Sequence, residues 1–136
     1  MSLFPLLLAA AAAQTAVQPP APVADAAPVP LTPPSDWSVV PPLPWRAPPQ
    51  PSPELDAFVE RTVATERCPV VGTRVAVEVA IFLRSDGLPR LVVPRAIDCP
   101  TVEQFAAGLV SSLARTNVRL PASGWYRTTI TFDWSK

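Results

Sequence analysis

The distribution of proline restricts the fold of this chain more than any other feature of its sequence. Fourteen of its 20 prolines lie between Val17 and Pro53. Proline fixes φ, removes a backbone donor and pushes the residue before it toward extended conformations. A stretch of this composition favours polyproline II, in which the carbonyls are solvated and no packed core forms. We therefore predict a disordered, proline-rich spacer over residues 14–51 and a folded domain over residues 52–136.

Two tryptophans, Trp37 and Trp45, lie within this spacer. Large aromatic side chains normally cover apolar surface, so we expect both to fold back on the domain. Residues 41–46 also fit the P-x-x-P-x-R pattern that aromatic grooves recognise. Because any stretch this rich in proline contains such a pattern by chance, a spacer is the favoured interpretation.

An apolar segment precedes the spacer. Residues 3–13 consist of Leu, Phe, Pro and a run of alanines, and they end in the small-residue pattern Ala11-Ala12-Ala13 before Gln14. This pattern is typical of a signal peptide and its cleavage site. The run is well short of the roughly 20 apolar residues that cross a bilayer as a helix. We predict a signal peptide over residues 1–13 and a periplasmic or secreted protein; a retained membrane anchor is the alternative.

The charged residues and the absence of histidine exclude several function classes. Eleven Lys and Arg balance eleven Asp and Glu, so no net charge attracts nucleic acid or an anionic membrane. Histidine, the commonest general base near neutral pH and the commonest zinc ligand, is absent. The only lysine, Lys136, is the last residue, and no acid pair or nucleophile–base set can be named. We therefore predict a protein that is not an enzyme, with no catalytic residues, cofactor, metal site or nucleic-acid partner.

Two stretches of the predicted domain have helical periodicity. Ser52, Pro53 and Glu54 are typical of an N-cap, a first helical residue and an acidic first turn. Apolar residues then recur at helical spacing, which predicts a helix over 53–66. A clearer amphipathic pattern predicts a second helix over 101–116, with Thr101 and Gln104 as a capping box.

Three stretches alternate between apolar and polar residues, as strands do. The first covers residues 75–84, and Ser85-Asp86-Gly87-Leu88 then predicts a type I′ turn leading to a return strand over 88–97. This turn pairs Ile81 with Val92 and Phe82 with Leu91. A third strand is predicted over 125–134. The order of elements predicts an α+β fold with two layers, in which both helices pack on one face of an antiparallel hairpin and a third strand.

The two cysteines, Cys68 and Cys99, flank the hairpin. An exported chain meets an oxidising compartment, where such a pair forms a disulfide. Redox activity is usually associated with C-x-x-C and a thiolate of low pKa, and this spacing is different. We predict a structural disulfide between Cys68 and Cys99.

The layout resembles the carboxy-terminal domain of the TonB and TolA group of periplasmic proteins. The resemblance covers residues 53–136 and is carried by four pieces: the hairpin around Asp86-Gly87, the helix over 101–116, the connector Arg119-Leu120-Pro121 with Gly124, and the last strand over 126–134. It implies a domain that binds a partner, such as a peptide of an outer-membrane transporter, by adding the partner's peptide to an exposed strand edge. Such strand addition uses main-chain groups and leaves little side-chain signature.

The resemblance implies that the last strand provides this edge. Its residues are Arg127, Thr128, Thr129, Ile130, Thr131, Phe132 and Asp133. The alternative is that these are ordinary strand residues. Pairing with a second copy of the chain also stays open.

Two other functions compete with a periplasmic protein-binding module. An anchored energy transducer of the TonB type would need its N-terminus retained in the inner membrane, and residues 1–16 are short and uncharged for that role. A small secreted enzyme would need a catalytic set, whereas Ser111 and Ser112 lie within a predicted helix without a base.

Overall fold

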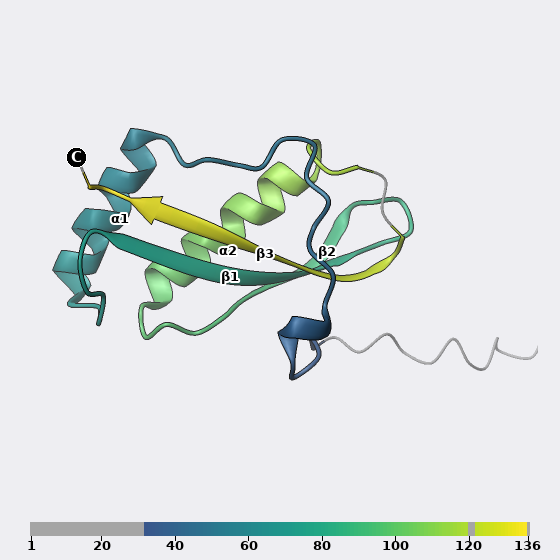
Figure 1. The fold of residues 1–136 in the computed structure, drawn as a ribbon, viewed down its shortest axis with the longest axis horizontal. Coiled ribbons are helices and arrows are strands. Elements are labelled where there is room, and N and C mark those ends of the chain that lie inside the picture. The colour runs from purple at the N-terminus through teal and green to yellow at the C-terminus, as the bar shows by residue number, and fades with distance from the viewer. Residues whose placement is uncertain (1–31, 120–121, 136) are drawn as a thin grey trace, which may run out of the picture.

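The computed structural model describes residues 32–119 and 122–135. Its elements are η1 (Trp37–Val39), α1 (Pro53–Glu66), β1 (Arg74–Leu83), β2 (Pro89–Pro94), α2 (Pro100–Ala114) and β3 (Gly124–Asp133). They form the predicted α+β fold (Figure 1). The predicted signal peptide and residues 14–31 of the predicted spacer lie outside the described residues.

The first helix has the predicted bounds and the predicted cap. The Ser52 hydroxyl accepts a hydrogen bond from the backbone N–H of Leu55 at 3.4 Å. Arg67 adopts the left-handed conformation (φ 52°) and ends the helix.

The capping box predicted for the second helix is wrong. The N-cap of α2 is Cys99, and Glu103 accepts from the backbone N–H groups of Ile97 and Cys99 at 3.1 and 3.0 Å. The Thr101 hydroxyl instead donates to Glu66 at the end of α1. The helix begins one residue earlier than expected because Pro100 suits the first helical position, where no N–H is needed.

The hairpin has the predicted pairs but a different turn. Ile81 lies opposite Val92 and Phe82 opposite Leu91. A type I′ turn needs positive φ at both central residues, whereas only Gly87 has it (φ 81°). The backbone N–H of Gly87 donates to the Arg84 carbonyl at 2.9 Å, so a tight turn is followed by a left-handed glycine and the register shifts by one residue.

The return strand is also shorter than the predicted 88–97. Its last ladder bond is the 2.8 Å contact from the Arg95 N–H to the Glu78 carbonyl. The chain then leaves the sheet toward Cys99, with Asp98 in the left-handed region (φ 58°).

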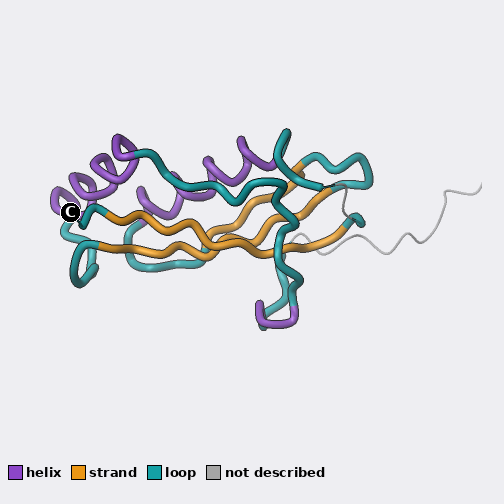
Figure 2. Tube along the Cα trace, turned by 45° about the horizontal axis from the view of Figure 1, so that its top comes forward, coloured by secondary structure: helices purple, strands orange, loops and turns teal. Residues whose placement is uncertain are grey.

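The sheet has the order β2-β1-β3, with both pairs antiparallel. Both α helices lie on one side of it and η1 lies on the other (Figure 2). Alternate residues of β1 point toward the helices and are buried with Val59, Val102, Val110, Ile130 and Phe132; these β1 residues are Val75, Val77, Val79, Ile81 and Leu83. The main core therefore lies between the sheet and the helices, as the alternation predicted.

The second half of the predicted spacer is not a spacer. Residues 37–47, which we call the strap, pack on the domain, and three of their side chains are buried: Trp37, Val40 and Leu43. Leu43 belongs to the main core and Trp45 packs against it, so both tryptophans fold back as expected. The packed unit consequently begins before residue 52, because apolar side chains among the prolines cover surface that the domain would otherwise expose.

The predicted disulfide is present. Cys68 and Cys99 are bonded, with their Cα atoms 5.3 Å apart and 31 residues of sequence separation. The bond ties the end of α1 to the beginning of α2, and Cys99 is completely buried in the core.

Candidate functional site

The outer edge of β3 is the candidate site. Because β3 is the last strand of the order β2-β1-β3, one side of its backbone faces away from β1. In an antiparallel ladder, successive residues direct their N–H and C=O groups alternately to the two sides. Arg127 directs both groups away from β1, so Thr129, Thr131 and Asp133 do the same.

The strap already occupies one end of this edge. The backbone N–H of Arg127 donates to the Pro41 carbonyl at 2.9 Å, and the Leu43 N–H donates to the Arg127 carbonyl at 2.8 Å. The Arg127 Nε also donates to the Val40 carbonyl at 2.8 Å. In Figure 1 the strap runs from η1 across the sheet and on toward α1. The chain therefore adds its own segment, in parallel orientation, to the start of the predicted binding edge.

A tryptophan fixes the strap where it passes to the helix side of the sheet. The indole Nε1 of Trp45 donates to the Thr128 hydroxyl at 2.9 Å. Beyond it, the Arg46 N–H donates to the Asn117 carbonyl and the Arg119 N–H donates to the Pro44 carbonyl, at 2.8 and 2.9 Å. The strap is thus hydrogen-bonded to both β3 and the segment after α2.

We expect Trp45→Phe to lower the free energy of unfolding by about 1–2 kcal/mol, because one partly buried hydrogen bond is lost together with part of the packing of the larger indole ring. Urea unfolding followed by circular dichroism measures this difference. Thr128→Ser keeps the hydroxyl and is the matched control; an equal loss in both variants would contradict the assignment of the effect to this bond.

A side chain of α1 closes the other end of the edge. One carboxylate oxygen of Asp56 accepts from the Asp133 backbone N–H at 3.2 Å. The Asp133 carboxylate accepts from both the backbone N–H and the hydroxyl of Ser135, and these hydrogen bonds lower the pKa of Asp133 below its ordinary value, with Arg74 adding a smaller effect. The end of the edge is therefore negatively charged at neutral pH.

Between these two ends the edge is open. Within the part of the chain that the structure describes, the outward N–H and C=O groups of Thr129 and Thr131 have no hydrogen-bond partner. A hollow of about 340 Å³ runs along them, and its lining residues are Pro49, Gln50, Pro51, Asp56, Arg74, Thr129, Thr131 and Asp133. The hollow therefore has the free backbone groups on one side and the proline segment after the strap on the other.

The opposite edge of the sheet is less suited to strand addition. β2 begins at Pro89 and ends at Pro94, and neither residue has an N–H to donate. Because Arg95 directs its N–H to β1, the backbone of its neighbour Pro94 faces away from the sheet. Pro94 therefore has no N–H to offer to a strand added at this edge. Prolines on an exposed strand are a common protection against unwanted pairing.

The predicted edge residues divide into four groups. Ile130 and Phe132 are buried in the core, and Thr128 holds Trp45. Arg127 is paired with the strap, whereas Thr129, Thr131 and Asp133 border the open hollow. The two tryptophans predicted that this segment folds back on the domain, whereas nothing in the sequence predicted its main-chain pairing with β3 at Arg127.

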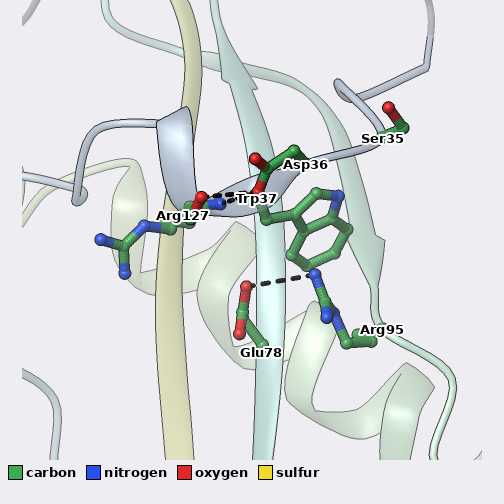
Figure 3. A pocket seen from close by; sticks show the side chains of 7 residues that line it. Ser35, Asp36, Trp37, Glu78, Arg95 and Arg127 are labelled. Carbon is green, nitrogen blue, oxygen red and sulfur yellow. Dashed lines mark hydrogen bonds and ion pairs between the residues drawn. The ribbon is translucent and has the colours of Figure 1, made fainter.

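A second hollow, of about 390 Å³, lies on the face of the sheet opposite the helices. In Figure 3 the Arg95 guanidinium lies over the Trp37 ring, 4.5 Å from its centroid, and pairs with Glu78 at 3.6 Å. Asp36 accepts from Ser38, whose hydrogen bonds lower the pKa of this carboxyl. These contacts hold η1 on the sheet.

One group of metal-ligating residue types occurs among the described residues, and its chemistry does not suit a metal. Glu66, Cys68 and Cys99 have candidate ligand atoms within 4.8 Å of one another. Both sulfurs belong to the disulfide, however, and thiolates are the form that binds metal. Glu66 also accepts from Thr101.

Comparisons with protein-family models, curated proteins and solved structures find no match to this chain. Among the described residues, no helix is long and apolar enough to span a membrane. The fold and the site define a disulfide-containing α+β domain with one partly open strand edge.

Proposed function

We propose that this chain is an exported protein-binding module that adds an extended peptide of a partner to the open part of β3. The observation that carries the proposal is the pair of residues, Thr129 and Thr131, whose outward backbone groups face a hollow instead of another strand. Exposed strand edges bind extended peptides through main-chain hydrogen bonds. The disulfide is consistent with export, since such bonds persist in oxidising compartments.

The strap also supports this function. Its contacts at Arg127 are main-chain hydrogen bonds of the kind that an added strand would make two residues further along β3. The edge is therefore able to hold an extended segment, and the strap limits where a partner can begin. The order of the elements resembles that of TonB-type domains, which supports the same mode of binding. On this resemblance, we propose an outer-membrane transporter as the source of the peptide.

We expect Thr131→Pro to weaken peptide binding at least tenfold with little loss of stability. The substitution removes an outward N–H and leaves the ladder bonds to β1 intact. Random nine-residue peptides displayed on phage would be selected on the purified full chain, and the affinities of the selected peptides measured by fluorescence anisotropy. At least a tenfold loss is expected, which corresponds to one hydrogen bond together with the displaced backbone.

Thr131→Ala is the matched control because it keeps the N–H and should keep the affinity. Equal binding by the proline variant, or the absence of any selected peptide, would overturn the proposed function.

A further inference from the structure

We propose that the segment added to β3 carries a lysine or arginine side chain at the end that reaches Asp133, where Asp56, Glu60 and Trp134 receive it. This inference rests on the proposed function and specifies the chemistry of the partner.

The two closed ends of the edge fix the position of the added segment. The strap blocks it at Arg127, and Asp56 reaches over the end of the strand at Asp133. The open stretch from Thr129 to Asp133 spans about 13 Å at the usual rise of a strand, which is room for about five residues. A segment of this length has one end that must lie next to Asp133.

A further hollow begins at that end. It measures about 340 Å³ and is lined by Pro53, Asp56, Ala57, Glu60, Asp133, Trp134 and Ser135. It shares Asp56 and Asp133 with the hollow along the open edge, so the two hollows lie next to each other. A side chain at the end of the added segment would therefore enter a space that the backbone contacts have already positioned.

The lining of this hollow is complementary to a cation. Three carboxylates border it, those of Asp56, Glu60 and Asp133, together with the ring of Trp134. Tryptophan is the best aromatic partner for a cation, and a carboxylate next to it adds Coulomb attraction. Arg74 is the cation nearest to Asp133, at 4.0 Å, but its side chain is 70% exposed, so its pairing with Asp133 is weak.

The state of the carboxylates also favours a cationic guest. The hydrogen bonds from Ser135 keep Asp133 ionised to lower pH than an ordinary aspartate. Asp56 uses one oxygen for the Asp133 N–H and has a second oxygen for a guest. Main-chain pairing would thus supply the affinity of the edge, and this hollow would supply its side-chain preference.

The peptide selection described above tests this inference when the selected sequences are read by position. We expect Lys or Arg to be enriched at one end of the segment of about five residues that the selected nine-residue peptides share. Replacing that residue by glutamine should weaken binding about tenfold, and Asp56→Asn with Glu60→Gln should weaken the cationic peptide to the level of its glutamine analogue. Glu54→Gln, an acidic α1 residue outside both hollows, is the matched control and should leave the preference unchanged.

The outcomes separate the two proposals. Peptides that bind in a Thr131→Pro-sensitive manner without an end preference, or with a preference unaffected by the Asp56 and Glu60 substitutions, would overturn the cationic inference and leave strand addition in place. A preference that the Glu54 substitution removes equally would assign it to the overall charge of α1 and would also overturn the inference.

Discussion

A chain that begins at residue 52 is expected to lose its stable fold, whereas one that begins at residue 32 should keep it. The reason is the strap, which buries Trp37, Val40 and Leu43. Each such side chain contributes about 1.5–3 kcal/mol when fully buried. Without the strap, this burial and the main-chain hydrogen bonds to Arg127 are lost together, and a small domain has only about 5–15 kcal/mol of stability to lose.

Because the shorter chain is expected to unfold, a point variant keeps this prediction measurable. Leu43 is 5% exposed and belongs to the main core, so Leu43→Ala should cost about 3 kcal/mol. Val39→Ala, at a strap residue that is 71% exposed, is the matched control and should cost less than about 0.5 kcal/mol. A 52–136 chain with the unfolding midpoint of the 32–136 chain would show that the strap is dispensable.

The disulfide has the next largest expected effect. It closes a loop of 31 residues between Cys68 and Cys99. On the chain-entropy estimate, such a cross-link stabilises the folded state by about 3.7 kcal/mol at room temperature. Replacing both cysteines with alanine should lower the free energy of unfolding by at least this amount, since Cys99 also fills space in the core.

Reduction of the unmodified chain separates the cross-link from the packing. Urea unfolding with and without reductant compares the same atoms, so the difference should be close to the entropy estimate alone. The double alanine variant should not respond to reductant. A difference below about 1 kcal/mol between the oxidised and reduced chains would contradict a stabilising role for the bond.

Local patterns predicted the elements well because the interactions behind them are local. The bounds of α1 follow from the Ser52 cap and the apolar spacing, and the pairs Ile81–Val92 and Phe82–Leu91 follow from the position of Gly87 in the turn. Two predicted details were wrong, the capping box of α2 and the type I′ turn, and at both places neighbouring residues compete for the same role. Glu103 caps the backbone N–H groups of Ile97 and Cys99, which precede the predicted box at Thr101, and the glycine alone takes positive φ in the hairpin.

The amino-acid sequence by itself determined the α+β order of the elements, the alternation along β1 and the pairing of Cys68 with Cys99, since each depends on periodicity or on residues that flank one hairpin. Only the tertiary structure decided the course of the proline-rich segment and the part of β3 that stays open. Both depend on main-chain contacts between Pro41 or Leu43 and Arg127, residues far apart in the chain. Backbone groups are alike at every residue, so no side-chain pattern marks where such a contact forms.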